Sequence, residues 1–296
     1  MRRLYHIPIT LLLLLAGVSA RSQIDSTNLG WKIGLNAGYY IASRHTAGFY
    51  SGHDHNENTI SFVFNNKYHF QEIMGLLHAS DTFRLEGLPE RMRYTPTMMV
   101  GFLFRNNFSE DKAWFIQFNQ VRLRTSDFYT IEVDPKPNIA IFPDLRSFSI
   151  IGEENRYHID LGYSQEFALR SPMYRPFIDA GITFTNTRVR SHKIRIEEKQ
   201  YSLINVYGSQ NYVPNTDLQT FEVIQGGVGF GGFFNLGMKF YVNEYFSLDP
   251  VVHLYVNTIN LEGYNHLRPH LFFNIRLMVN NLFLFNQRHM GGGSQL

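Results

Sequence analysis

The chain has 296 residues, no cysteine and a formal net charge of +2. The lack of cysteine excludes disulfides, a thiolate metal site and an anchor built on a lipid-modified cysteine. A nearly neutral chain without a basic run also lacks the electrostatic footprint of a nucleic-acid-binding protein. We therefore expect no nucleic-acid partner.

The N-terminus has the pattern of a secretory signal peptide. Two arginines precede an apolar stretch at 7–18, and small residues follow it. Such a segment is too short to be a membrane-spanning helix. We assign residues 1–22 to a signal peptide and expect the mature chain to start at Arg21 or Gln23.

Residues 155–185 contain two long alternating segments joined by a polar turn at 170–175. The apolar face of the first segment consists of Tyr157, Ile159, Leu161, Tyr163, Phe167 and Leu169. Strands of soluble sandwiches have about 5–6 residues, whereas a tilted strand needs about 9–11 to cross a bilayer. Since no apolar run after the leader is long enough for a spanning helix, the sequence predicts a closed transmembrane barrel.

Alternation with a period of two predicts eight strands along the chain. Their approximate ranges are 31–41, 94–105, 112–133, 147–169, 175–196, 230–242, 246–260 and 268–285. Tyr94 falls on the outward face of the second strand. In the third strand the apolar residues change phase between Phe118 and Val121, which predicts a β-bulge. Turns at both 152–155 and 197–200 would instead give ten strands.

The predicted connections alternate between long and short. The two longest, 42–93 and 197–229, fall at one end of the predicted barrel, and the short turns fall at the other end. Outer-membrane barrels show this pattern, with the long loops outside the cell. Within 42–93, helical spacing behind Asn65-Asn66 predicts a short helix at about Tyr68–Ala79. The fold class is therefore all-β, a single antiparallel up-and-down barrel at 23–285 with a short periplasmic tail at 286–296. A soluble, lipocalin-like barrel is the alternative.

Several segments carry a resemblance to known proteins. They are a leader that ends in Ser-Gln, MRYTPTMMVGFLFRNNF at 92–108, PFIDAGITF at 176–184, and a last strand rich in Asn and Phe. With these segments the chain resembles small outer-membrane β-barrel proteins of Bacteroidota, both porin-like proteins and barrel components of type IX secretion and gliding machinery. The resemblance implies location in the bacterial outer membrane, contact with its lipid, and insertion by the outer-membrane assembly machinery. It supplies no residue-level site.

Two kinds of chemical site can be weighed from the residues. In a glycine- and histidine-rich part of the first loop, His53 and His55 flank Asp54, a donor set that suits zinc or copper. The alternative is a polar surface loop. The loop residues that a hydrolase would use, Asp54, His78, Asp81, Ser191 and His192, form no recognisable catalytic arrangement. We therefore expect no enzyme activity and no cofactor, with an outer-membrane hydrolase as the alternative.

Inward positions of the predicted strands carry matched charges. Counting from the turns places Lys239 opposite Asp249, His253 opposite Arg276, and Glu166 close to Asp179 with Lys239 beside it. Because eight strands enclose only enough space for side chains, this set predicts a closed lumen.

Such a protein acts structurally or through its outer loops, by binding a ligand or a partner. The alternatives are a subunit of an envelope secretion or gliding machine, with 42–93 as the contact to an envelope protein, and a narrow porin-like channel. An apolar helix face of 42–93 left uncovered favours a partner, and a plug formed by 42–93 favours a self-contained barrel.

Overall fold

The computed structural model describes residues 29–135, 143–169, 173–208, 210–243 and 245–279. The predicted signal peptide, the end of the predicted last strand and the tail at 286–296 lie outside these ranges. Within them, no helix combines the length and the apolarity needed to cross a membrane.

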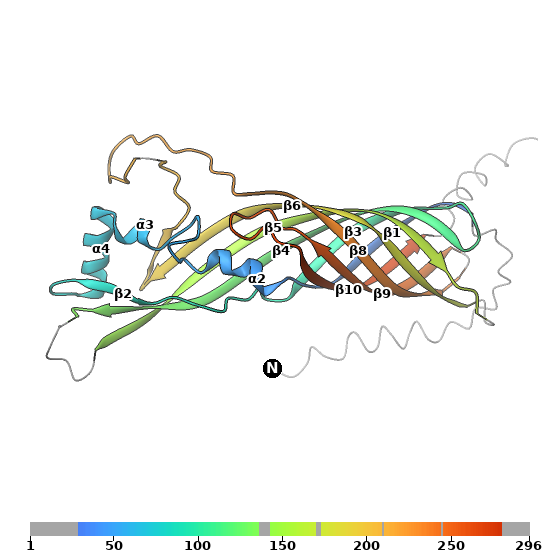
Figure 1. Cartoon of the computed structure of the whole chain (residues 1–296), viewed down its shortest axis with the longest axis horizontal. Helices are drawn as coiled ribbons and strands as arrows, with labels where there is room; N and C mark the ends of the chain where they lie inside the picture. Colours follow the sequence, from blue (N-terminus) through green and yellow to red (C-terminus); the bar gives the residue numbers. More distant parts are fainter. Residues whose placement is uncertain (1–28, 136–142, 170–172, 209, 244, 280–296) are drawn as a thin grey trace, which may run out of the picture.

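Eight antiparallel strands form a closed ring (Figure 1). They are β1 (Gly30–Ile41), β3 (Thr97–Asn107), β4 (Lys112–Val133), β5 (Asp144–Glu166), β6 (Tyr174–Ile196), β8 (Gly226–Tyr241), β9 (Phe246–Asn257) and β10 (Arg268–Val279). Each strand pairs with its neighbours along the chain, and β1 pairs with β10 to close the ring. The predicted eight-stranded barrel is therefore confirmed.

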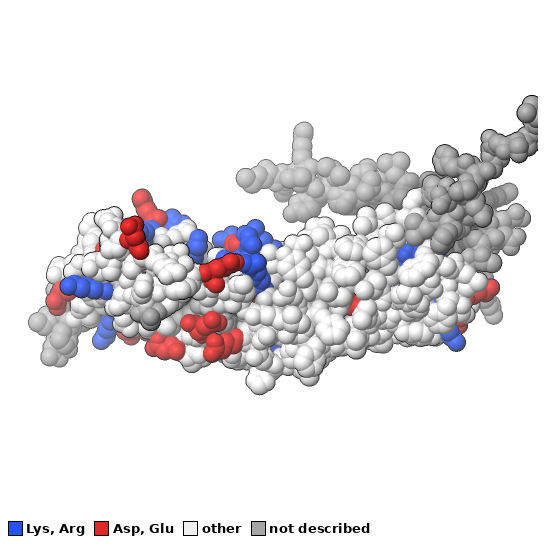
Figure 2. All heavy atoms as spheres, turned by 90° about the horizontal axis from the view of Figure 1, so that it is seen from above, with Lys and Arg blue, Asp and Glu red and all other residues white. Residues whose placement is uncertain are grey.

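The outer surface of the ring is an apolar belt. Its exposed side chains include Leu35, Tyr39, Met98, Phe102, Ile159, Leu161, Ile182, Phe230, Leu236, Val252, Phe273 and Ile275. Figure 2 shows this half of the molecule as almost uniformly free of charged atoms. An even number of antiparallel strands with an apolar outer belt and a polar interior defines the fold of an outer-membrane β-barrel protein. The protein is located in the bacterial outer membrane.

Three strands continue far beyond the belt. The strands β4, β5 and β6 have 22, 23 and 23 residues, whereas β1 and β9 have 12 each. Two short strands widen this extension, since β2 (Phe83–Gly87) pairs with β4 and β7 (Lys199–Ser202) pairs with β6. The turn at Glu197 therefore only starts the β7 hairpin, and 152–155 is continuous strand, so the ten-strand alternative is wrong.

The first long connection folds against the inner face of this extension. It contains α2 (Arg44–Ala47), the 3-10 helix η1 (Gly48–Tyr50), α3 (Ser61–Phe64) and α4 (Lys67–Leu77). The predicted helix is confirmed as α4, and its cap is Asn66, whose side chain accepts from the backbone N–H groups of Tyr68 and His69. Ile73 and Leu77 of α4 are fully buried.

The interior of the extension is apolar, which corrects the predicted bulge. Register between β3 and β4 is unbroken from Met99↔Val121 to Asn107↔Ala113. Val121 and Leu123 are buried inside, whereas Trp114 lies outside. The apolar residues change face because the surroundings change: lipid lies outside the lower part of β4, and the helices of 42–80 lie inside its upper part.

A closed ring has no unpaired edge, so detergent unfolds it slowly. We expect the mature chain to fractionate with the outer membrane and to migrate faster on a gel when unheated than after boiling. Semi-native electrophoresis of purified membranes checks this. Recovery of the folded chain as a soluble periplasmic protein would contradict it.

Candidate functional site

The lower lumen holds a buried ion network. The carboxylate of Glu166 on β5 accepts from Arg105 on β3 at 2.6 Å and also from Lys239 on β8. Asp179 on β6 accepts from Arg276 on β10 at 2.8 Å and from the amide of Asn235 at 3.1 Å. All six side chains are almost completely buried, so each of the five charges is compensated where water is scarce.

The pairings differ in part from those predicted. The register next to Lys239 and Asp249 sets these two level, because Phe240 pairs with Leu248 and Gly237 with Val251. However, Arg276 lies opposite Asp249. His253 lies opposite Phe272, so the predicted His253–Arg276 pair is wrong. The ladder of β9 and β10 starts at Asn257↔Arg268, so the observed register differs from the predicted one by four residues and keeps the same faces.

The arrangement around Glu166 also needs correction. Its neighbour on β6 is Phe177, whereas Asp179 lies opposite Ser164. Asn235 is the residue of β8 that lies beside Asp179, and Lys239 lies two strand pleats away and bonds Glu166 instead. The six predicted residues are all buried, but Glu166 and Lys239 belong to one cluster, Asp179 and Arg276 to another, and His253 lies outside both.

A second layer of polar and aromatic groups fills the lumen above the ions. Asp160 accepts from the hydroxyls of Thr183 at 2.6 Å and Tyr255 at 2.8 Å. The Tyr255 ring stacks on His253 on one side, at 4.0 Å between centroids, and on His158 at 4.8 Å. Gly162 makes room for this filling, because a Cβ there would come within 2.8 Å of the rings of Phe115 and Phe233.

Tyr50 from η1 lies buried in the mouth of the barrel. Its hydroxyl donates to Glu154 at 2.6 Å, and Glu154 also accepts from Arg156 at 2.5 Å. The ring lies over Gly152, where a Cβ would come within 2.2 Å of it. Tyr94 also donates to Glu154, at 3.1 Å. Burial and the negative charge of Glu154 raise the pKa of Tyr50 well above its usual value, which keeps this hydroxyl a donor.

Tyr94 is a correction to the outward face predicted for it. The ladder of β3 starts only at Thr97, and before it the chain makes a single bridge from Tyr94 to Thr125. Because Tyr94 precedes β3, the alternation of β3 does not set the direction of its side chain. The Tyr94 side chain points inward and is 8% exposed.

His192 on β6 ties the same loop to the wall. Its Nε2 lies 3.1 Å from the carbonyl oxygen of Tyr50, and its ring packs edge-on against the Tyr50 ring at 5.2 Å. Burial lowers the pKa of His192 to about 3. The imidazole is therefore neutral at physiological pH, and its N–H donates to the Tyr50 carbonyl.

The predicted metal ligands lie together at the surface of the first loop. The rings of His53 and His55 stack at 5.3 Å between centroids. The carboxylate of Asp54, however, accepts from the hydroxyls of Thr59 and Ser61, both at 2.6 Å. Across the described part of the chain, no group of three or more metal-ligating side chains occurs. Metal binding by His53 and His55 stays a prediction that rests on two imidazoles.

The residues considered for catalysis do not converge. Ser191 and His192 are neighbours on β6 and point to opposite faces of the wall. His78 ends α4 in the left-handed conformation, with φ at 52°. Asp54 is held within its own loop by Thr59 and Ser61. No pair among them has the geometry of a nucleophile and its base.

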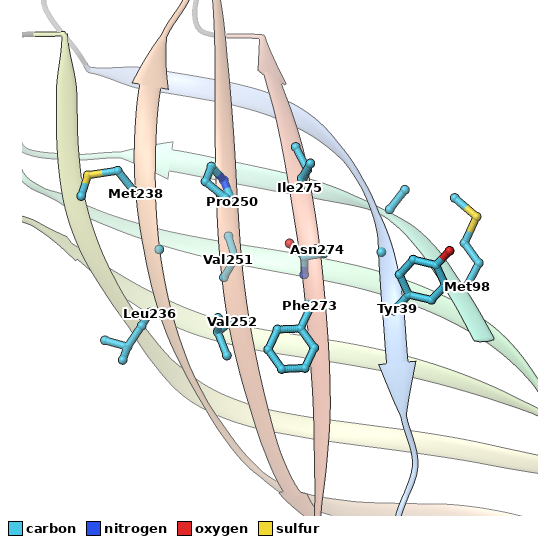
Figure 3. A pocket seen from close by; sticks show the side chains of 13 residues that line it. Tyr39, Met98, Leu236, Met238, Pro250, Val251, Val252, Phe273, Asn274 and Ile275 are labelled. Atoms are coloured by element: carbon cyan, nitrogen blue, oxygen red, sulfur yellow. The ribbon is translucent and has the colours of Figure 1, made fainter. Parts of the chain in front are cut away.

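A large hollow of about 740 Å³ lies on the outside of the barrel (Figure 3). Side chains from β1, β3, β8, β9 and β10 line it, among them Tyr39, Met98, Leu236, Pro250, Val252 and Phe273. Most of the side chains that line it belong to the apolar belt, so it faces lipid.

Sequence reasoning missed the mouth site. Glu154 and Arg156 alternate with outward residues, so their inward position was visible, but their partner Tyr50 belongs to a loop 104 residues away from Glu154. Of the four buried histidines, at 158, 192, 253 and 270, only His253 was assigned to the lumen from the sequence, and His192 was considered only as a loop residue. Their signal was an inward position on a strand rather than clustering along the sequence.

Comparison with known proteins finds similarity to solved structures alone. No protein-family model matches the sequence, and no curated protein matches it. Among solved structures, the chain is similar to the outer membrane protein OprG from Pseudomonas aeruginosa, with 10% identity and a TM-score of 0.37, covering 86% of this chain and 96% of OprG. It is also similar to Neisserial surface protein A, with 10% identity, a TM-score of 0.34, and 85% and 97% covered.

The N-terminal β-barrel domain of OprF from Pseudomonas aeruginosa gives the same result. Its identity is 10% and its TM-score 0.33, with 84% of this chain and 96% of that domain covered. These neighbours are small outer-membrane barrels. The assignment to a Bacteroidota type stays a prediction from the sequence segments.

The ion network makes a stability prediction. Glu166→Gln leaves Arg105 and Lys239 facing a neutral amide, and breaking such a buried pair costs about 3–5 kcal/mol. We expect the free energy of unfolding to fall by that order. Urea unfolding in lipid vesicles measures it, with the fluorescence of the Trp31–Trp114 pair as reporter. Ser164→Ala, at the preceding inward position of β5, is the control. Equal stability of both variants would contradict the network.

His192 makes a pH prediction. Its pKa is lowered from 6.5 to about 3, so between these values the unfolded chain binds a proton that the folded chain does not. Folding stability therefore decreases as pH falls from 6.5 towards 3, by roughly 1.4 kcal/mol per pH unit for this one group. His192→Gln keeps an N–H donor and should show a shallower loss over that range. Melting curves of the two proteins at pH 7 and pH 4 measure the loss of stability in each. An equal loss in the wild type and in His192→Gln would contradict the prediction.

Proposed function

We propose that this protein is a closed outer-membrane barrel that displays a rigid cap outside the membrane, and that it acts through this cap by binding a ligand or partner. The cap consists of 42–93, β7 and the upper parts of β4, β5 and β6. The single observation that carries the proposal is the filling of the barrel interior from the lower ion network to Tyr50 at the mouth.

The charge balance of the lumen supports a closed state. The buried cations below the mouth are Lys32, Arg105, Lys239 and Arg276, and the buried carboxylates are Asp160, Glu166, Asp179 and Asp249. A selective pore is lined by an excess of one charge sign or by ordered polar groups around water. Here four cations face four carboxylates among the described residues, and several of them bond one another directly.

The cap favours a self-contained barrel over a subunit of a larger machine. An obligate partner would be expected to cover an apolar helix face. The apolar residues of α4 instead pack within the protein, with Ile73 and Leu77 buried and Phe70 stacked on Phe83 at 4.6 Å. Charged side chains gather on the visible face of the cap (Figure 2). Such a surface suits reversible recognition.

Planar-bilayer recording tests the closed lumen. We expect no stable unitary conductance from the wild type. Gly152→Leu removes the space for the Tyr50 ring and should give brief openings, because the mouth loses its seal. A conducting porin in the same bilayer controls for insertion. Stable conductance by the wild-type protein would refute the closed state and favour the narrow-channel alternative.

A further inference from the structure

A row of outward polar and basic side chains crosses three neighbouring strands. Arg122 on β4 lies opposite Asn155 on β5, and Asn155 lies opposite Arg188 on β6. Adjacent strands are about 4.8 Å apart, so the two arginines start roughly 10 Å from each other on one face of the wall. Such spacing allows two guanidinium groups to converge on one ligand.

This row has a defined height above the apolar belt. Two residues lower on the same strands lies the row Gln120, Tyr157 and Asn186, and two further lies the row Phe118, Ile159, Phe184 and Phe230. Each two-residue step rises about 5 Å along the barrel axis for strands tilted by about 40°. The arginines therefore start about 10 Å beyond the top row of the belt. The head-group layer extends about 5–8 Å beyond the hydrocarbon on each side, so the arginines start at its outer edge, within reach of its phosphates for a side chain as long as arginine.

A β-bulge adds a third arginine. Glu154 pairs with Val189 and Glu153 pairs with Ser191, so Arg190 is the extra residue on β6. A bulge re-aims the side chain that it carries. Here Arg190 is exposed on the outer face, next to Arg188.

A hollow of about 390 Å³ opens beside these arginines. It lies between β6 and two stretches of chain, 202–206 and 221–223. Arg188, Arg190 and Lys193 contribute to one side of it, and Ile204, Val206 and Phe221 to the other. A second hollow of about 190 Å³, on the other side of Ser191 and Lys193, includes Arg124 and Arg195. Cations beside an apolar wall suit a ligand that carries both phosphate and hydrocarbon.

The charge of this surface is unbalanced. The basic cluster is defined here as Arg122, Arg124, Arg188, Arg190, Lys193 and Arg195. The carboxylates bonded to it are Glu153, 2.6 Å from Arg122, and Glu222, 2.9 Å from Arg188. The Arg188–Glu222 pair is open to solvent, with side chains 50% and 77% exposed, and in the other pair Arg122 is 67% and Glu153 21% exposed. Exposed pairs contribute under about 1 kcal/mol, so an incoming phosphate can replace Glu222 at Arg188 and reach the open side of Arg122.

We propose that the basic cluster binds the phosphate groups of a phosphorylated glycolipid in the outer leaflet. The acyl chains of that lipid lie on the belt below, along Phe118, Ile159 and Phe184. The arginines donate bidentate hydrogen bonds to phosphate, as guanidinium geometry favours. Tyr157, between the two rows, occupies the interfacial height that tyrosine prefers. The cluster lies where β4 and β6 enter the cap, and lipid binding there does not require that the cap bind a further ligand or partner.

Native mass spectrometry of the full mature chain in detergent tests this proposal. The probes are diphosphorylated lipid A, the same lipid A after phosphatase treatment, phosphatidylglycerol and inorganic phosphate. We expect the wild type to retain diphosphorylated lipid A about tenfold or more better than the dephosphorylated form. Arg122→Gln/Arg188→Gln should abolish this preference.

The matched control is Lys112→Gln/Arg84→Gln, which removes the same charge at the opposite end of β4 and at the edge of the cap. The faster migration of unheated protein shows that each variant is folded. Equal retention of the two lipid A forms by the wild type overturns the proposal, as does an unchanged preference in Arg122→Gln/Arg188→Gln. Competition by inorganic phosphate alone, or tighter binding of a soluble sulfated polysaccharide, would instead identify a site for a soluble anion and also overturn it.

Discussion

Closure of the strand ring is the constraint on which the rest of the structure depends. In hydrocarbon, every backbone N–H and C=O group needs a partner within the protein, and eight strands meet this need only when β1 pairs with β10. The same closure fixes how much space remains inside. A ring of this size holds side chains and little else. Each inward residue is therefore buried whether it is polar or not.

Burial at every inward position explains the chemistry of the lumen. An isolated charge there would be costly, so the cations come with carboxylates, as Arg105 and Lys239 do with Glu166. Glycine at 162 gives up its side chain so that the rings of Phe115 and Phe233 fit. The network thus follows from closure of the ring, because every charge that points inward is buried and needs a partner. An apolar lumen of the same size would need equally close packing.

Outside the membrane the same three strands reverse their polarity. Leu123, Ile150 and Ile194 point into the cap, whereas Arg122 and Arg188 point to solvent. The reversal follows from the two environments, because water replaces lipid outside and the first loop replaces the ion network inside. The same inward positions of β4, β5 and β6 therefore line a polar lumen within the membrane and an apolar core within the cap.

Sequence could predict whatever depends on local periodicity. The strands, the helix capped by Asn66 and the contrast between long and short connections follow from alternation, capping and loop length. The register between strands cannot be predicted in this way, because β9 and β10 keep the same faces when they slide past each other by any even number of residues. The sequence therefore identified His253 and Arg276 as inward but paired them wrongly. Tyr50 belonged to a loop with no period, so nothing local indicated that it fills the mouth.

The filled interior also limits which surfaces a ligand could reach. Tyr50 contacts Glu154 and His192 on two different strands, so the loop that closes the mouth cannot move without breaking buried hydrogen bonds. A ligand that required entry would have to disrupt them at a cost of about 1–3 kcal/mol for each buried group left unpaired. The outer surfaces carry no such cost. Along the barrel axis the outer surface changes from the apolar belt to the basic cluster and then to the cap. Each of these zones faces a different environment.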